Sequence, residues 1–200
     1  MKIEISDKLI NRFKEACYSD VSDVSSHIER LIETDLSKDV DGLTGFQTRW
    51  SFISEVNMQI LRKRDNSKIL FNELFLCIDI DRLVDLLDYH GHLSGDEVLI
   101  SVSKTLSHRH PNNRICRWGG DEFVVWLKDD DTRPINLDDE LCKKYRNVGI
   151  KRCVVDFSIN DPESSNHRIL HWITCNIDLG MIKASINGDR INCGNPPKQK

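Results

Sequence analysis

The chain has 200 residues, which is enough for one domain of ordinary size and a short additional module. Hydrophobic residues make up 39% and charged residues 30%, so the chain can bury a core and stay soluble. The formal net charge of -4 implies no strong overall attraction to nucleic acid or membrane, and no apolar run is long enough to span a bilayer. Because the N-terminus also lacks the apolar core of a signal peptide, we expect a cytoplasmic protein with no membrane partner.

Residues 1–37 are predicted to form a separate module. The alternating segment Lys2–Ile5 is typical of a short strand, and two amphipathic helices follow, with apolar stripes that include Leu9, Phe13, Ile28 and Leu31. Strand, helix and helix in this order resemble the ribbon-helix-helix fold, which would imply DNA binding by residues 1–36. We favour the plainer interpretation, in which the two helices pack on the main domain or on a second copy of the chain.

The main domain is predicted to cover residues 38–193, before a disordered tail at 194–200. In chain order we expect a helix, a strand, a helix, a hairpin, a helix, a strand and a helix. Apolar residues recur at helical spacing in Trp50–Arg64, Gly95–Leu106, Leu137–Tyr145 and Ile169–Ile186. The strands are expected at Leu70–Ile80, Arg114–Trp118, Phe123–Leu127 and Lys151–Ile159, with a polar turn at Lys63–Lys68. This order predicts an α+β fold in which helices cover a sheet and the hairpin lies beside the first strand.

Two acidic clusters fall at the ends of predicted strands. Asp79 and Asp81 end the first strand, and Asp121 and Glu122 follow Gly119–Gly120 in the hairpin turn. A strand end and a neighbouring hairpin turn can bring carboxylates together, and such hard oxygen ligands suit Mg²⁺. Two magnesium ions can activate a hydroxyl and stabilise a leaving pyrophosphate. The alternative is that these acids are ordinary surface residues of turns.

Four ordered segments resemble the GGDEF family of nucleotide cyclases. The hairpin turn Arg117–Phe123 reads R-W-G-G-D-E-F and carries the signature that names the family. Asp41–Phe52 resembles the opening motif D-x-L-T-G-L-x-N-R-x-x-F, and Asp79–Asp96 resembles D-x-D-x-F-K-x-x-N-D-x-x-G-H-x-x-G-D. Asp178–Gly188 resembles the final helix A-D-x-A-L-Y-x-A-K-x-x-G-R-N. The resemblance covers about residues 40–191.

The resemblance implies a fold similar to the palm domain of adenylyl cyclases and polymerases, with a mostly antiparallel central sheet flanked by helices. It implies that two subunits, each holding one GTP, face each other and produce cyclic di-GMP. The metal ions, Mg²⁺ or Mn²⁺, would be held by Asp79, the carbonyl group of Ile80 and Asp121, and Glu122 would assist a metal or the attacking hydroxyl. Purine nucleoside triphosphates and a second copy of the chain are therefore the expected partners.

The resemblance also implies a set of nucleotide contacts. Backbone amides of Arg82, Leu83 and Val84 would donate to phosphate oxygens, and Asp96 would accept hydrogen bonds from a guanine edge. Glycines in the signature turn allow a phosphate to approach closely. The full set of nucleotide-binding positions is Arg82, Leu83, Val84, Leu87, Asp96, Gly119, Gly120, Lys183 and Arg190.

Several of these positions depart from the family pattern. Leu87 stands where the family has an asparagine that helps to read guanine, and a site that loses a polar partner loses discrimination. The other departures remove expected cations. Ser185 stands where the family has a lysine, although Lys183 is nearby, and Asp189 stands where it has an arginine, although Arg190 is adjacent. Val84 stands where the family has another lysine. The intact carboxylates favour an active enzyme. The alternatives are a cyclase that makes an adenine-containing product in signalling or phage defence, a degenerate domain that binds a nucleotide or a protein, and a DNA-binding regulator.

Overall fold

The structure is a computed structural model. It describes residues 39–65, 68–128, 135, 139–145, 148–161, 164–186 and 190–197. The chain divides into two units, Met1–Asp39 and Val40–Lys200. The module predicted for residues 1–37 lies outside the described residues.

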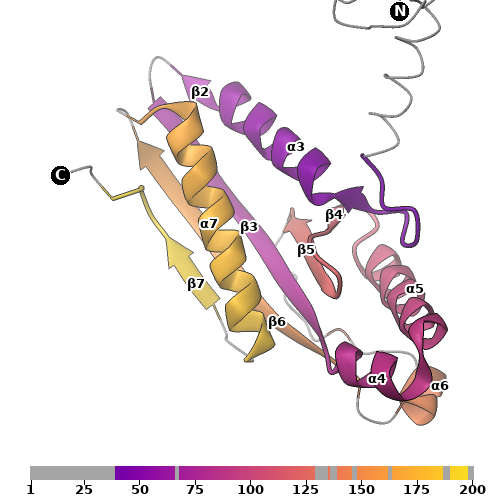
Figure 1. Cartoon of the computed structure of the whole chain (residues 1–200). Coiled ribbons are helices and arrows are strands. Elements are labelled where there is room, and N and C mark those ends of the chain that lie inside the picture. Colours follow the sequence, from indigo (N-terminus) through magenta and orange to yellow (C-terminus); the bar gives the residue numbers. More distant parts are fainter. Residues whose placement is uncertain are drawn as a thin grey trace, which may run out of the picture. The chain divides into compact units, whose positions relative to one another are not determined.

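The centre of the second unit is a long strand, β3 (Lys68–Asp81), with an antiparallel neighbour on each side. These neighbours are β5 (Glu122–Leu127) and β6 (Gly149–Asp161) (Figure 1). The strand order in the described part of the chain is β1-β4-β5-β3-β6-β7, and β2 pairs with the start of β3. The remaining strands are β1 (Gln47–Thr48), β2 (Arg64–Asp65), β4 (Arg114–Arg117) and β7 (Arg190–Cys193). Only the β1–β4 and β6–β7 pairs are parallel, so the predicted, mostly antiparallel sheet is confirmed.

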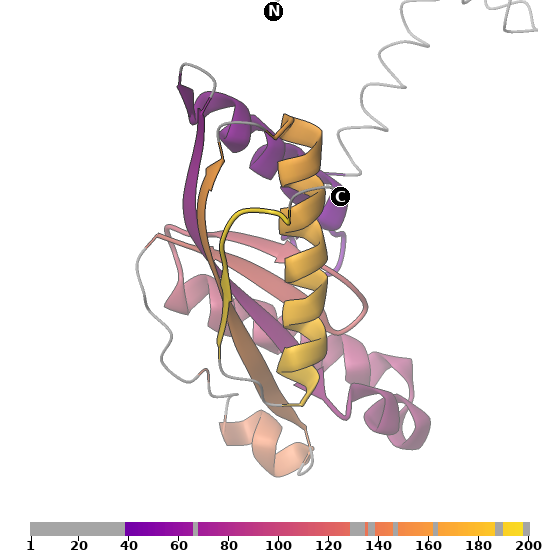
Figure 2. The same ribbon diagram turned by 90° about the vertical axis from the view of Figure 1, so that its left-hand side faces the viewer.

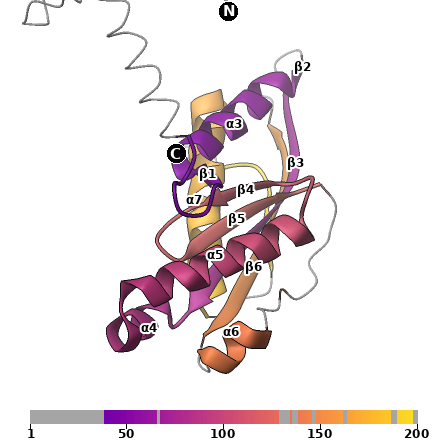
Figure 3. The same cartoon turned by 90° about the vertical axis from the view of Figure 1, so that its right-hand side faces the viewer.

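Helices cover both faces of this sheet (Figures 2 and 3). One face is packed by α3 (Arg49–Arg62) and α7 (Asn166–Ser185), which bury Phe52, Val56, Ile173 and Ile177. The other face is packed by α4 (Leu83–His90), α5 (His92–Arg109) and α6 (Asp139–Lys144), with Leu86, Val98, Val102 and Leu141 among the buried residues. The α+β architecture expected from the sequence is therefore confirmed. No helix in the described ranges is both long and apolar enough to cross a bilayer.

Alternation along β3 decides which side chains face which layer. Phe71, Phe75 and Cys77 join the core under α3 and α7, whereas Ile78 and Ile80 join the core on the α5 side. Successive side chains of a strand point to opposite faces. The residues that continue the first series beyond Cys77, at the end of β3, therefore lie on the side of α7.

Two expectations about irregular segments differ from the structure. Arg64–Asp65 form β2 instead of a polar turn, because they pair with the first residues of β3. The disorder predicted for residues 194–200 is not found at residues 194–197. The side chain of Asn195 accepts a hydrogen bond from the Asn160 amide at 2.7 Å and donates one to its carbonyl at 2.9 Å, and Trp172 Nε1 donates to the Gly194 carbonyl.

Besides the two-residue strands β1 and β2, two further elements, α4 and β7, were not expected from the sequence. The first begins after Arg82, which has no capping side-chain hydrogen bond and therefore gives no start signal for a helix. The second buries only Cys193 and depends on its parallel pairing with β6, a contact far away in sequence.

Helix α7 lies close against the sheet at Gly180. A Cβ atom at this position would lie 2.5 Å from Val155 Cγ2 and 2.7 Å from Cys77 Sγ, both of which belong to fully buried side chains. Glycine is therefore required here by packing, and it lets the C-terminal half of α7 lie directly over β3 and β6.

We predict that Gly180→Val lowers the free energy of unfolding by about 2 kcal/mol, because overpacking a rigid core costs roughly 1–3 kcal/mol. Urea unfolding of the full chain measures this change. Gly42→Val is the control, since no atom lies within 4 Å of its added Cβ, and we expect a change below about 0.5 kcal/mol. Equal stability of the two variants would contradict the close packing of α7.

Candidate active site

A row of three charged residues crosses the sheet at the end of β3. Asp79 pairs in register with Glu122 of β5 on one side and with Lys151 of β6 on the other. Asp79 and Lys151 follow the same alternation as the buried Cys77 and Cys153, so they lie on the face covered by α7. The ammonium group of Lys151 confirms this placement, because it donates to the carbonyl oxygen of Ser185 at the end of α7 at 3.1 Å.

The hairpin turn brings Asp121 to the same end of the sheet. The amide of Ile80 donates to the carbonyl of Asp121 at 3.1 Å, beyond the last regular pair of β3 and β5. The turn is closed by the amides of Trp118 and Gly119, which both donate to the carbonyl of Glu122, at 2.8 and 3.3 Å. The structure therefore brings together the two acidic clusters that the sequence separates by about forty positions.

Glu122 folds back over the first glycine of the signature. A Cβ atom at position 119 would lie 2.4 Å from Glu122 Oε2, whereas one at position 120 would meet nothing within 4 Å. Any side chain at position 119 would therefore displace the Glu122 carboxylate. Gly120 instead leaves open space beside Asp121, which is what a close approach by a phosphate requires.

An ion pair between Arg117 and Asp41 fixes the position of the hairpin turn. Arg117 donates to both carboxylate oxygens of Asp41, at 3.2 and 3.1 Å, and to the carbonyl of Gly120 at 2.7 Å. Asp41 also accepts hydrogen bonds from the amide and hydroxyl of Thr44, at 2.9 and 2.6 Å. The opening motif of the domain therefore holds the signature turn through Arg117.

A second anchor ties the turn to the helical layer. Trp118 Nε1 donates to Asp178 of α7 at 2.9 Å, and Arg49 of α3 donates to both oxygens of the same carboxylate at 3.0 Å. The Arg49 guanidinium also lies over the Trp118 ring, 4.3 Å from its centroid. One carboxylate thus links α3, α7 and the hairpin.

Negative charge is concentrated in the row. Burial raises the pKa of Asp79, and Asp121 and Asp81 raise it further against the opposing charge of Lys151. Burial likewise raises the pKa of Glu122, with added contributions from Asp121 and Asp79. Carboxylates that repel one another in this way favour either a proton or a cation.

The donor set fits a hard divalent cation that keeps part of its coordination for other ligands. Within the described residues, no three His, Cys, Asp or Glu side chains group closely enough to hold a metal by themselves. Asp79 and Asp121 offer two carboxylates, and Ile80, whose carbonyl is the third expected ligand, follows Asp79 in the chain and is hydrogen-bonded to Asp121 through its amide. Mg²⁺ is commonly bound by one or two carboxylates, with water and phosphate oxygens completing its octahedron.

Helix α4 begins directly beside these carboxylates. Arg82 has left-handed backbone angles, φ 62° and ψ 27°, so the chain turns sharply between Asp81 and the helix. No side chain caps the N-terminus, and the first amides of a helix, here those of Leu83 and Val84, have no partners within the helix. Helix N-termini attract phosphate groups. The side chain of Arg82 is paired with Asp85 at 2.7 Å.

The two expected base-reading residues lie on neighbouring helices, α4 and α5. Leu87 is half-buried and packs against Gly95, where a Cβ atom would lie 2.4 Å from Leu87 Cδ2. Asp96 follows Gly95 and lines an open groove of about 790 Å³ along α5, together with Leu93 and Ile100. Leu87 is therefore a packing residue between the two helices.

The expected phosphate cations have different surroundings. Lys183 is exposed on α7, and Arg190 on β7 pairs with Asp156 at 3.5 Å. By alternation Asp156 lies on the opposite face of β6 from Lys151, so the structure does not bring Arg190 to the carboxylate row. Lys151 instead occupies that place.

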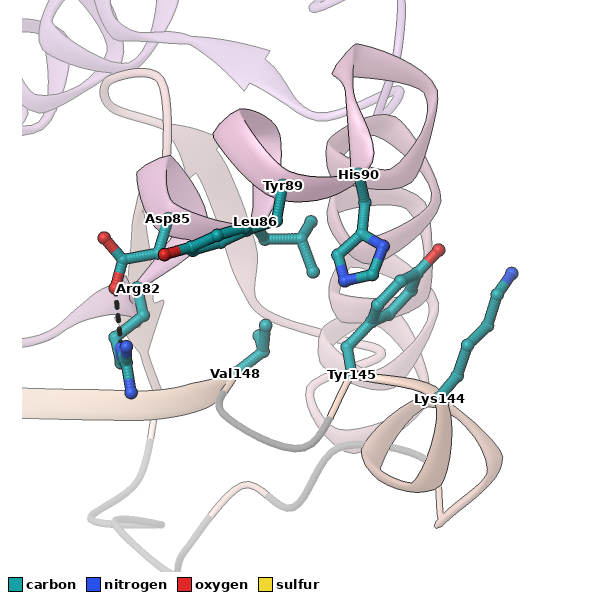
Figure 4. A pocket seen from close by; sticks show the side chains of 8 residues that line it. All are labelled: Arg82, Asp85, Leu86, Tyr89, His90, Lys144, Tyr145 and Val148. Atoms are coloured by element: carbon teal, nitrogen blue, oxygen red, sulfur yellow. Dashed lines mark hydrogen bonds and ion pairs between the residues drawn. The ribbon is translucent and has the colours of Figure 1, made fainter.

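A smaller hollow of about 280 Å³ lies on the flank of α4, lined by residues of α4, by Lys144 at the end of α6 and by residues that follow it (Figure 4). The ion pair of Arg82 and Asp85 borders one side of it, and the ring of His90 faces that of Tyr145, with centroids 5.5 Å apart. His90 therefore packs on an aromatic ring. The hollow shares Arg82 with the end of β3 but none of the carboxylates of the row.

Four residues that hold or complete the row had no predicted site role, namely Arg49, Arg117, Lys151 and Asp178. For Lys151 a signal was available. It lies in phase with Cys153, Val155 and Phe157, and a charged residue on the buried face of a predicted strand indicates a buried partner.

Comparison with known proteins identifies related sequences. A family model described as "Diguanylate cyclase, GGDEF domain" matches residues 38–150. The probable diguanylate cyclase DgcI of Escherichia coli K12 is 32% identical over 111 residues, which cover 51% of this chain and 25% of that protein. Diguanylate cyclase DgcP of Pseudomonas aeruginosa is 35% identical over 104 residues, which cover 51% of this chain and 14% of that protein. The chain thus spans a quarter or less of these curated relatives.

Solved structures share the fold. The coiled coil and GGDEF domain of DgcB from Caulobacter crescentus, in complex with c-di-GMP, aligns with a TM-score of 0.54 at 16% identity and covers 94% of this chain and all (100%) of that chain. Diguanylate cyclase SiaD of Pseudomonas aeruginosa, in complex with its activator SiaC, aligns with a TM-score of 0.53 at 18% identity over 93% of this chain and 74% of that chain. At these identities the likeness concerns the fold alone.

We predict that the pair of Asp41 and Arg117 makes stability depend on pH. Burial acts to raise the pKa of Asp41, but hydrogen bonds from Thr44 and the charge of Arg117 outweigh it, so the pKa is lowered. A carboxylate with a lowered folded pKa stabilises the protein above its unfolded pKa of about 3.9, and this contribution is lost as the pH falls through the folded value.

The wild-type chain should therefore exceed Asp41→Asn in unfolding free energy by about 1–2 kcal/mol at pH 7, and the difference should shrink below about pH 4. Urea unfolding across this range measures it. Asp85→Asn, which removes the exposed pair with Arg82, serves as the control and should change stability little. A wild-type advantage over Asp41→Asn that is independent of pH would contradict the assigned role of the charge.

Proposed function

This chain belongs to the GGDEF family, and we propose that it is a metal-dependent nucleotidyltransferase that joins two purine nucleoside triphosphates into a cyclic dinucleotide. GTP is the proposed substrate, and cyclic di-GMP is the proposed product. The observation that carries the proposal is the convergence of Asp79, Asp121 and Glu122 at the end of β3. The curated relatives named as diguanylate cyclases support the same reaction.

In the proposed mechanism, Asp79, the carbonyl of Ile80 and Asp121 would hold Mg²⁺ or Mn²⁺. When bound, these ions supply charge stabilisation for the leaving pyrophosphate and lower the pKa of the attacking 3′-hydroxyl. The hydrogen bond between Ile80 and Asp121 keeps the two carboxylates together, so little reorganisation is needed when substrate arrives.

Glu122 is the proposed proton acceptor. Its pKa is raised, chiefly by burial, which makes it a better base than an exposed glutamate. The bond from the 3′-oxygen to the α-phosphorus forms as the bond to pyrophosphate breaks, and the hydroxyl proton moves to the Glu122 carboxylate. The uncapped amides of Leu83 and Val84 at the start of α4 would orient the phosphates.

A dimer follows from this chemistry, because each domain offers one carboxylate row and the product contains two nucleotides. Twofold pairing is the commonest way to bring two identical sites face to face. Residues 1–36 are the proposed dimerisation segment, so specific activity should rise with protein concentration.

The test of the function is Asp121→Asn. Losing one charged ligand should reduce product formation at least about 100-fold while the chain remains folded, because preorganised charge in such sites is worth several kcal/mol. Purified protein is incubated with each purine triphosphate and Mg²⁺, and products are identified by mass spectrometry. Asp156→Asn is the matched control, an acid of the same sheet on the opposite face, and should retain activity. Near-normal turnover by folded Asp121→Asn, or no product from wild type with any purine triphosphate, overturns the proposal.

A second candidate, altered base choice, is favoured by the packing of Leu87 against Gly95. Guanine would leave its O6 without an amide partner there, and an unpaired buried polar group costs about 1–3 kcal/mol. Adenine has no O6 and would lose less, although Asp96 would meet fewer donors. An adenine-containing cyclic dinucleotide is the corresponding alternative product.

We therefore predict relaxed selectivity between GTP and ATP, with GTP somewhat favoured. Leu87→Asn should shift use toward GTP by roughly ten-fold, the equivalent of about 1.4 kcal/mol. Competition assays with equimolar GTP and ATP measure this shift, and Leu87→Ala separates the gain of an amide from the loss of packing. Strict GTP use by wild type that is unchanged in Leu87→Asn would show that position 87 does not read the base.

A further inference from the structure

We propose that Lys151 binds the triphosphate of the substrate, supplying from β6 the positive charge that the C-terminal end of α7 lacks at Ser185. This inference rests on the proposed function and concerns how the same site recognises its substrate.

Lys151 lies where three elements of the site meet. Its ammonium nitrogen is 2.8 Å from Asp81 Oδ1 at the end of β3 and 3.1 Å from the carbonyl oxygen of Ser185 at the end of α7. In the strand register it is directly opposite Asp79. Cross-strand neighbours on one face have Cβ atoms about 5 Å apart, so this ammonium group borders the carboxylates proposed to hold the metals.

The environment of Lys151 shows why a charge is tolerated on this face of the strand. The residues in phase with it, such as Cys153 and Val155, are buried under α7, and its own side chain is only 25% exposed. A cation in such a place needs compensation. Asp81 provides the counter-charge, and the C-terminal carbonyl groups of α7 provide the negative end of a helix dipole.

Lys151 carries a cation to the C-terminal end of α7. A lysine at position 185 would start from the residue whose carbonyl Lys151 contacts, so Lys151 brings positive charge to the same end of the helix from the neighbouring strand. Two other cations are paired elsewhere. Arg82, of which only the backbone amide was expected to meet a phosphate, pairs with Asp85, and Arg190 pairs with Asp156.

The two partners of Lys151 give it a different role with and without substrate. Without a metal, its charge balances the crowded carboxylates. A divalent ion on Asp79 and Asp121 would take over that balance, and the flexible ammonium group could then turn its donors toward phosphate oxygens. Lys151 should therefore oppose binding of the metal alone and favour binding of the triphosphate.

Lys151 should weaken binding of the metal alone but strengthen binding of the triphosphate. A purely structural residue would not change these two affinities in opposite directions. The variants are Lys151→Met and the double variant Lys151→Met/Ser185→Lys, which returns the cation from the helix. The control is Lys63→Met, which removes another half-buried lysine paired with a β3 carboxylate, Glu73, toward the other end of the strand. Calorimetric titration of the full chain measures binding of Mn²⁺ alone, of guanosine, and of 3′-deoxy-GTP or 3′-deoxy-ATP with Mn²⁺, since these analogues lack the attacking hydroxyl.

For Lys151→Met we expect about ten-fold weaker binding of the 3′-deoxy triphosphate, unchanged binding of guanosine and several-fold tighter binding of Mn²⁺ alone. The double variant should recover triphosphate affinity to within about three-fold, and the control should match wild type. If wild type binds a triphosphate and Lys151→Met binds it equally, or loses triphosphate, guanosine and Mn²⁺ binding together, the inference is wrong and the proposed function stands. If wild type binds neither triphosphate, both are overturned.

Discussion

The register of β3 against its two neighbours is the constraint on which the rest of the site depends. Pairing Asp79 with Glu122 and with Lys151 places three charged side chains side by side on one face of the sheet. A slip of one residue would send Asp79 into the apolar core beneath α5, because side chains alternate between faces. The large side chains of Phe71 and Phe75 under α3 and α7 oppose such a slip, since each of them would also change sides.

Charge crowding at this end of the sheet is sustained by packing elsewhere. Repulsion among the carboxylates would open an isolated hairpin. Here Arg117 holds the turn through the carbonyl of Gly120, and Asp178 of α7 holds it through the indole of Trp118. Gly180 lets α7 lie close enough to the sheet for its end to meet Lys151. These close contacts therefore hold the acidic residues in fixed positions. Such preorganisation is what an active site needs to stabilise charge that develops in a transition state.

Departures from the family pattern have a physical reading in this arrangement. At Ser185, where the family pattern led us to expect a cation, the proposed substitute is Lys151 of the neighbouring strand, whose flexible side chain reaches the carbonyl of this residue. Leu87 has no comparable substitute among its described contacts, since it packs on Gly95 and presents no hydrogen-bonding group. In the proposed nucleotide site, the expected phosphate end thus retains a nearby cation, whereas the expected base end has no hydrogen-bonding side chain at position 87.

The sequence by itself determined the α+β class, the helices and strands of strong periodicity and the two acidic clusters, because these depend on local residue spacing. It did not reveal α4, which has no capping side chain, or β7, whose pairing partner β6 lies far away in the chain. The neighbours of the acids were decided only by the tertiary structure. Lys151 and Asp178 reach the site through the strand register and the position of α7. Periodicity marks Lys151 as a charge on the buried face of its strand, but the partners of both residues are long-range contacts that local spacing does not reveal.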